Sequence, residues 1–185
     1  MRNDPVLPSA VPQRVQLRTA TVADAALIAE MHTRSRASAY RGMLTDRYLD
    51  HEALAEALAL WPGKLCELAA GAGGVLIAQR DQQALGFACM LKPDENRSVC
   101  IDKLHAVSEH KGSGAGTALL DEARRWALAC GATRLHLFVF EAKLAAIGFY
   151  ESRRWQLIGS QNDTMGGSDI VALIYALPLH PGLTL

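Results

Sequence analysis

Three glycines at alternate positions constrain this chain more than any other feature of its sequence. The stretch reads Lys111-Gly112-Ser113-Gly114-Ala115-Gly116-Thr117, between a strand-like run at 98–107 and a helix-like run at 117–130. Glycine lets the backbone turn tightly and approach a ligand, and N–H groups at the start of a helix attract anions. The stretch predicts either a phosphate or pyrophosphate site or a flexible loop without a ligand.

The spacing of these glycines excludes two common nucleotide motifs. A P-loop has four residues between its first glycine and a Gly-Lys-Ser/Thr triplet, whereas Lys111 precedes all three glycines. A dinucleotide fingerprint reads Gly-x-Gly-x-x-Gly, whereas these glycines run Gly-x-Gly-x-Gly past the middle of the chain. The ligand must therefore be inferred from other parts of the sequence.

The composition is that of one domain without a charge bias. The chain has 185 residues, 50% of them hydrophobic, with 19 basic and 19 acidic side chains. We expect neither a nucleic-acid surface nor a membrane surface, because no block of like charges or long apolar run occurs. We expect a single domain at 14–178, a disordered or loosely attached tail at 1–13 that is not a secretory signal, and a C-terminal tail at 179–185.

The cysteines give no metal-binding pattern. Cys66, Cys89, Cys100 and Cys130 lie far apart, with no Cys-x-x-Cys pair among them. We therefore predict no metal site, and place Cys89 and Cys100 in the core as small apolar residues. This pattern fits a reduced, cytoplasmic protein best.

The order of the remaining patterns predicts an α/β fold of the α+β kind. Strand-like runs occur at 15–18, 75–78, 84–91, 98–107, 134–140, 155–159 and 170–177. Two helices are expected before 75, the second ending where Pro62-Gly63 interrupts it, and two more at 117–130 and 144–152. A polar loop is expected at 160–169. We predict a mixed, mostly antiparallel central sheet of about seven strands with helices on both faces, in which 98–107 and 134–140 are parallel neighbours.

Two motifs in this order resemble those of the GCN5-related N-acetyltransferase (GNAT) superfamily. Its acetyl-CoA motif, Gln/Arg-x-x-Gly-x-Gly/Ala, is similar to 111–116, with Lys111 in the first position. Its second motif, Asn-x-x-Ala-x-x-Phe-Tyr-Glu, is similar to 143–151, with Lys143 in place of the asparagine. The likeness covers 15–177 and implies the acyl-CoA N-acyltransferase fold.

The front of the chain resembles a narrower, bacterial subgroup of that superfamily. Residues 35–49 are similar to its pattern Ser-Trp-Arg-x-x-Tyr-Arg-Gly-x-Leu-x-x-x-Tyr-Leu, although Arg36 stands where tryptophan is usual. That subgroup acts on many acceptors, so the likeness does not name the substrate.

The resemblance implies an enzyme that moves an acetyl group from its co-substrate, acetyl-CoA, to a primary amine of a small molecule or peptide by direct attack. The alternative is a non-catalytic acyl-CoA-binding or regulatory module, because a fold does not establish a function. Homodimers are common in the superfamily, and the final strand pair could form such an interface.

The resemblance also assigns cofactor-binding roles. The backbone N–H groups of Gly112, Ser113, Gly114, Ala115, Gly116 and Thr117, with Lys111 beside them, would hold the pyrophosphate. The backbone of Leu104, His105, Ala106 and Val107 would hold the pantetheine arm, with the N–H of Ala106 or Val107 facing the thioester oxygen. Lys143 and Phe149 complete the expected cofactor site, although Lys143 could equally be solvated.

The expected catalytic groups are a tyrosine and a carboxylate. Tyr150 matches the family tyrosine that protonates the departing CoA thiolate, unless it only packs against the sheet. Asp102 is a candidate base, or a charge paired with Lys103 or an arginine, and strand alternation places it on the face of Cys100 and Leu104. Glu141 is the alternative base. His105, which alternation places opposite Asp102, is a third candidate.

The acceptor site is expected near the loop between the two leading helices. Tyr40, Arg41 and Tyr48 are the candidate acceptor-binding residues, unless they serve ordinary packing and solvation. The loop at 160–169 is expected to form the opposite wall.

Overall fold

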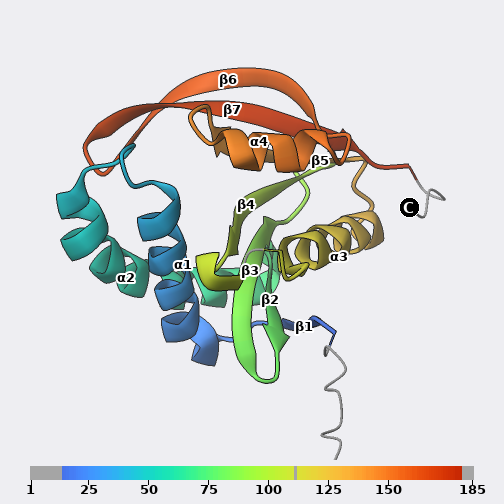
Figure 1. Ribbon diagram of the computed structural model, residues 1–185. Helices are drawn as coiled ribbons and strands as arrows, with labels where there is room; N and C mark the ends of the chain where they lie inside the picture. The colour runs from blue at the N-terminus through green and yellow to red at the C-terminus, as the bar shows by residue number, and fades with distance from the viewer. Residues whose placement is uncertain (1–13, 111, 181–185) are drawn as a thin grey trace, which may run out of the picture.

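Seven strands form one sheet through the middle of the molecule (Figure 1). The structure is a computed structural model, and it describes residues 14–110 and 112–180. The strand order is β1-β2-β3-β4-β5-β7-β6, and only β4 and β5 are parallel. This confirms the predicted mixed, mostly antiparallel sheet. The strands are β1 (Gln16–Thr19), β2 (Gly73–Arg80), β3 (Gln83–Leu91), β4 (Ser98–Ala106), β5 (Arg134–Phe140), β6 (Gln156–Met165) and β7 (Ser168–Pro178).

Helices cover both faces of the sheet, as predicted. α1 (Ala25–Ala39) and α2 (Ala53–Glu67) pack on one face, where Ile28, Trp61 and Phe87 share a core cluster. α3 (Ala115–Ala129) and α4 (Leu144–Glu151) pack on the other face. The site described below lies where α1, α3 and α4 all approach the end of β4.

The second helix does not end at Pro62-Gly63, contrary to the prediction. α2 includes Pro62 and continues to Glu67, preceded and followed by π-helical turns. Proline cannot donate the backbone hydrogen bond to the residue four positions before it, Leu58. Both Pro62 and Leu58 are exposed, so water can bond that carbonyl group, while Trp61 is buried and holds the helix against the sheet.

Most of the segment predicted as a polar loop, 160–169, is strand. β6 and β7 form one long antiparallel hairpin that turns at Gly166-Gly167, where both glycines have positive φ. Nearly all of β6 is exposed. A strand that is exposed on both faces has no alternation of polar and apolar residues, so its sequence resembles a loop.

A β-bulge in β4 reverses the expected alternation of side chains. Cys89 of β3 pairs with Lys103 and Met90 pairs with Ile101, so Asp102 is an additional residue between them. Asp102 contacts Lys64 of α2, so it lies on the same face as His105, whose ring contacts His32 of α1. Leu104 packs on the opposite face, with the cluster around α3. The prediction that Asp102 shares a face with Leu104 and opposes His105 is therefore wrong.

Strands β4 and β5 separate after a short parallel pairing. Their register runs only from Ser98–Arg134 to Ile101–Leu137. Among the described residues, no strand pairs with that side of β4 from Asp102 to Ala106. This opening in the sheet exposes backbone groups that a ligand can bond.

The ends of the domain differ slightly from the prediction. Leu179, expected in the C-terminal tail, is buried in the core and its N–H bonds the carbonyl of Thr133 at 2.8 Å. The expectations for 1–13 and 181–185 lie outside the described residues. Among the described helices, none combines the length and apolar character needed to cross a membrane.

Candidate active site

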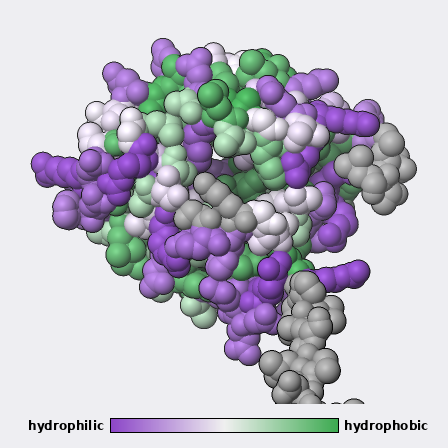
Figure 2. All heavy atoms as spheres, in the orientation of Figure 1, coloured by the Kyte–Doolittle hydropathy of each residue, from purple (hydrophilic) through white to green (hydrophobic). Residues whose placement is uncertain are grey.

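A cleft of about 860 Å³ lies between the glycine loop, the end of β4, α4 and the last turn of α1. Figure 2 shows a hollow near the centre of one face of the molecule. Most of the predicted cofactor-binding residues line this cleft: Leu104, His105, Ala106, Gly112, Ser113, Gly114, Ala115, Gly116, Thr117, Lys143 and Phe149. The structure therefore brings together residues that are about 45 positions apart in the sequence.

The glycine loop has the geometry of an anion cradle. Gly112 and Gly114 have φ values of 78° and 84°, in the left-handed region that glycine favours. α3 begins directly after them, and within the described residues the N–H groups of Gly116 and Thr117 have no backbone acceptor. These N–H groups and the positive end of the helix dipole suit a phosphate group. Lys111 lies outside the described residues.

Arg153 is a cleft residue that the sequence analysis missed. Its Nη2 donates to Thr117 Oγ1 at 2.8 Å, and its guanidinium lies 3.8 Å from the centre of the Phe149 ring. The Phe149 ring also packs close to Gly116, where a Cβ would lie 3.4 Å from Phe149 Cζ, in van der Waals contact. Arg153 therefore adds a positive charge beside the helix N-terminus. The signal for it was its place three residues after Tyr150, just beyond the second motif.

Of the four residues expected to hold the pantetheine arm, Leu104 and Ala106 direct their backbone N–H and C=O groups toward the cleft. The N–H of Val107 bonds the carbonyl of Leu85 at 2.9 Å, so it is not available for an oxyanion, and Val107 is buried away from the cleft. Backbone groups alternate in direction along an antiparallel strand, so those of Leu104 and Ala106 point away from β3, toward the opening beside β5. Ala106 remains the candidate oxyanion donor, and Val107 does not.

A second, smaller chamber of about 240 Å³ adjoins the cleft. Its walls come from α1, β4, β5, α4, β6 and β7. Five residues line both spaces: Leu104, His105, Lys143, Ala146 and Tyr150. The two spaces therefore meet at the opening between β4 and β5, and we call the smaller one the acceptor chamber.

Tyr150 lies at this junction. Its side chain is almost fully buried, with 7% of the residue exposed, and its ring packs against those of Phe149 and Trp155. Burial raises the pKa of the phenol, and the neighbouring Tyr40 raises it further. The hydroxyl is therefore protonated at neutral pH, the state that an acid requires.

Asp102 is held between two ammonium groups. Its carboxylate pairs with Lys64 and, at 2.8 Å, with Lys103. Burial acts to raise its pKa, but the attraction and hydrogen bonds of these lysines outweigh burial, so the net pKa is lowered. A carboxylate in this state is a weak proton acceptor at neutral pH. Glu141, the alternative base, is exposed and lines neither the cleft nor the acceptor chamber.

The three expected acceptor-binding residues are in different settings. Tyr40 lines the acceptor chamber, its ring 4.8 Å from that of Phe140 and 4.3 Å from the Nζ of Lys143. Arg41 is exposed and pairs with Asp46 and Asp50, so the structure does not bring it to the chamber. Tyr48 is buried outside the chamber.

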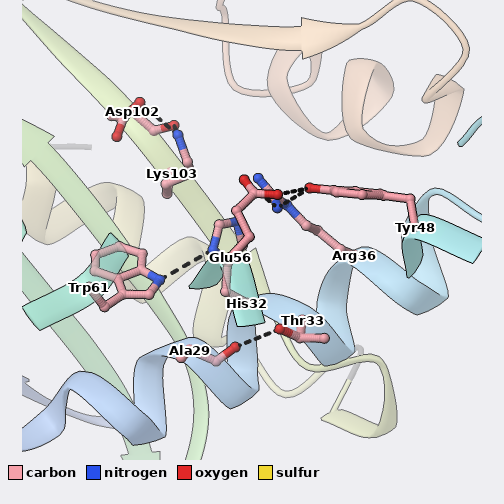
Figure 3. A network of polar contacts seen from close by, with 9 residues as sticks. All are labelled: Ala29, His32, Thr33, Arg36, Tyr48, Glu56, Trp61, Asp102 and Lys103. Atoms are coloured by element: carbon pink, nitrogen blue, oxygen red, sulfur yellow. Dashed lines mark hydrogen bonds and ion pairs between the residues drawn. The ribbon is translucent and has the colours of Figure 1, made fainter. Parts of the chain in front are cut away.

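A network of polar side chains, most of them buried, supports the wall that α1 contributes (Figure 3). The Nη1 of Arg36 donates to the hydroxyl of Tyr48 at 2.8 Å, and that hydroxyl donates to Glu56 Oε2 at 2.5 Å. The indole Nε1 of Trp61 donates to Nδ1 of His32 at 3.3 Å. Tyr48 also packs against Gly166 in the β6–β7 turn, where a Cβ would overlap its ring. No sequence motif indicates a role for His32, and Arg36 stands out in the sequence only as a departure from a pattern.

His105 belongs to the same network. Its Nδ1 lies 2.9 Å from Ser35 Oγ, and its ring stacks on that of Phe87 with the ring centres 5.3 Å apart. Burial, first, and then nearby positive groups hold its pKa well below the usual histidine range. A neutral imidazole at this position packs and positions, and is a poor proton acceptor.

Solved structures with this fold come from several organisms. A GCN5-related N-acetyltransferase from Rhodopseudomonas palustris has 22% identity and a TM-score of 0.74, covering 92% of this chain and 99% of its own. PaiA N-acetyltransferase from Thermoplasma acidophilum, solved with coenzyme A, has 17% identity and a TM-score of 0.70, covering 87% and 98%. The yncA protein from Salmonella typhimurium, solved with acetyl-CoA, has 18% identity and a TM-score of 0.69, covering 94% and 98%. At these identities the likeness shows the fold.

A comparison with family profiles is more specific. No curated protein gives a significant match. Residues 37–154, which include the glycine loop, the end of β4 and Tyr150, match the profile of the acetyltransferase (GNAT) family. This match covers more than half of the chain, so the protein belongs to the acetyltransferase (GNAT) family.

Proposed function

We propose that this protein is an N-acetyltransferase that moves the acetyl group of acetyl-CoA to a primary amine of a small molecule by direct attack. One observation carries the proposal: the cleft and the acceptor chamber meet at Tyr150, in the opening between β4 and β5. A donor in one space and an amine in the other would have their reacting groups adjacent, without a covalent enzyme intermediate.

The cleft fits the parts of acetyl-CoA, which would supply the thioester carbonyl that the amine attacks. The N–H groups at the start of α3, with the guanidinium of Arg153, suit its pyrophosphate. The outward-facing backbone groups of Leu104 and Ala106 suit the two amides of the pantetheine arm. The related PaiA and yncA proteins were solved with coenzyme A and acetyl-CoA, which supports the same ligand here.

Tyr150 is our candidate for the acid that protonates the departing thiolate. Burial keeps the phenol neutral, so it still carries a proton that it can give to the thiolate as the carbon–sulfur bond breaks. Neither Asp102 nor Glu141 is placed to act as a strong base, so we propose that the ammonium group loses its first proton to solvent before the amine attacks. The proton that the attacking nitrogen then releases replaces the one that Tyr150 gives to the thiolate.

The test is an amine panel assay that follows release of the CoA thiol. We expect transfer to at least one amine, and we expect Tyr150→Phe to lower kcat by about a hundredfold or more while the Kd of acetyl-CoA stays nearly unchanged. Tyr175→Phe is the matched control, because Tyr175 is a buried neighbour that lines neither space.

The result separates the enzyme from a binding module. Tight binding of acetyl-CoA with no thiol release across the panel would favour the non-catalytic alternative. Equal turnover in the wild type and Tyr150→Phe, with chemistry shown to be rate-limiting, would reject the role of Tyr150.

A further inference from the structure

The acceptor chamber presents two unused hydrogen-bond donors from one face of α1. His32 and Arg36 are four residues apart on the helix, so their side chains are neighbours, and both line the chamber. Only 1% of His32 and 6% of Arg36 is exposed. Buried donors normally have acceptors, so a buried donor that lacks one within the protein calls for an acceptor from a water or a ligand.

The proton of His32 is on the nitrogen that has no partner. Its Nδ1 accepts the hydrogen bond of Trp61, which leaves Nε2 as the protonated nitrogen of a neutral ring. Nε2 is buried and has no hydrogen-bond partner anywhere in the described part of the chain. Leaving such a donor unpaired is costly, and an acceptor atom in the chamber would remove that cost.

Arg36 has a charge that the protein only partly balances. Its closest carboxylate is Glu56, with Nη1 and Oε1 3.6 Å apart, and Glu56 is half-exposed. Its Nη1 donates to Tyr48, and we find no acceptor for Nε or Nη2 among the described residues. A guanidinium with two free N–H groups on one edge matches the two oxygens of a carboxylate.

The other charges of the chamber agree with an anionic ligand group. The cationic side chains that line it are Arg36, Lys103 and Lys143, against the carboxylates Asp102 and Asp163. Asp102 is engaged by Lys64 and Lys103, so the remaining cations, Arg36 and Lys143, outnumber the remaining carboxylate, Asp163. A polycationic acceptor would meet like charge here, and a volume of about 240 Å³ suits a molecule of amino-acid size.

We propose that the acceptor is a small amine that also carries a carboxylate, and that this carboxylate binds Arg36 and the Nε2–H of His32. The inference rests on the proposed acetyl transfer and adds the class of substrate. The carboxylate would orient the molecule against α1 and leave its amine free to reach the junction at Tyr150.

The first test compares acids with their own amides. The probes are L-α-amino acids and ω-amino acids, each beside its primary amide, assayed by thiol release with acetyl-CoA. We expect kcat/KM of the best acid to exceed that of its amide by at least about tenfold. An α-amino amide has the less basic amine and is deprotonated more easily, so a preference for the acid cannot come from amine reactivity.

The second test measures, in the wild type and in variants of α1, the kcat/KM of the best acid divided by the kcat/KM of its amide. Arg36→Gln should reduce this ratio by about ten- to a hundredfold, and His32→Phe should reduce it by several-fold. Tyr48→Phe is the matched control, because it removes the same hydrogen bond to Arg36 but keeps the guanidinium. A variant that only weakens the fold would lower both activities and leave the ratio unchanged.

Binding measurements separate this inference from the proposed reaction. The same acids are titrated calorimetrically into the CoA-saturated wild type and into Arg36→Gln. Binding of acids that depends on Arg36, without thiol release, would support the carboxylate subsite and reject the acetyl transfer. Acetylation of amides and acids with equal kcat/KM, an unchanged ratio in Arg36→Gln, or no binding of any acid would overturn the subsite.

Discussion

At the scale of single residues, the ion pairs of Asp102 say more about its role than its position near the junction does. Asp102 is near the expected position for a base, yet Lys64 and Lys103 both bond its carboxylate. The half-buried Asp102 carboxylate therefore balances the positive charges of these two lysines. Its lowered pKa means that it stabilises the fold above its unfolded pKa near 4, and that this contribution is lost as the pH falls toward its folded value.

Asp102→Asn should therefore affect stability and not the pH dependence of the reaction. Losing the carboxylate leaves two ammonium groups unpaired, and we expect the free energy of unfolding to fall by about 1–3 kcal/mol. Urea unfolding measures this loss, and a pH profile of kcat/KM should keep its acidic limb. Glu141→Gln is the control, with little expected change in either quantity because Glu141 is exposed. Loss of the acidic limb in Asp102→Asn alone would show that Asp102 is the base.

The sequence indicates some site residues much better than others. Tyr150 and the glycine loop belong to motifs with fixed spacing, and the structure places them where a strand–turn–helix unit must place them. His32 and Arg36 have no such motif. The role of a polar residue on the buried face of a helix can be inferred only when the residues opposite it are known. For His32 and Arg36, those residues are the walls of the acceptor chamber that β4, β5 and β6 form.

At the scale of elements, the shape of β4 determines the site. One additional residue at Asp102 reverses the faces that follow it, and the pairing with β5 ends just before it. Sequence periodicity cannot detect a single inserted residue, which is why Leu104 and His105 were assigned to the wrong faces. The continuation of α2 through Pro62 and the extension of β6 were missed for a related reason, since exposed segments have weak patterns.

Gly86 of β3 holds the end of β4 close, and its replacement should show this. A Cβ at Gly86 would overlap the carbonyl oxygen of His105 and lie 3.0 Å from the Cα of Ala106. We expect Gly86→Ala to destabilise the protein by about 1–3 kcal/mol and to weaken acetyl-CoA binding, because the strand beside the cleft must move.

The matched substitution for Gly86→Ala is Gly63→Ala. Gly63 is an exposed residue of α2, and a Cβ there would meet nothing within 4 Å. This change should stabilise the protein by about 0.4–1 kcal/mol. Thermal melts and acetyl-CoA titrations of both variants provide the comparison. If Gly86→Ala matched Gly63→Ala in both measurements, the close approach of β3 to β4 would have no energetic importance.

At the scale of the whole molecule, the histidines buried between α1 and the sheet make the fold sensitive to acid. Burial, first, and then nearby positive charges lower the pKa of His32 to about 3, and that of His105 is also lowered. The unfolded chain therefore binds more protons than the folded one between about pH 3 and pH 6.5. Stability is unaffected above this window and falls as the pH decreases through it.

His32→Gln should reduce that sensitivity. We expect the variant to be less stable than the wild type near neutral pH, because it loses ring contacts with Trp61 and Phe87. Below about pH 6 its free energy of unfolding should decline less steeply, by about 1.4 kcal/mol per pH unit. Urea unfolding between about pH 5 and pH 7 measures both slopes, above the range in which carboxylates titrate. Parallel slopes would mean that His32 is protonated in the folded protein.

The five residues that line both the cleft and the acceptor chamber make the two ligands thermodynamically linked. If bound CoA orders Tyr150 or Lys143 and thereby changes the binding free energy of the acceptor, bound acceptor must change the binding free energy of CoA by the same amount. The Kd of CoA measured with and without a saturating acceptor must therefore change by the same factor as the Kd of the acceptor measured with and without CoA. Substitutions at these shared positions should change that factor, whereas substitutions at Arg153 or Arg36, which each line one space, should change only one affinity.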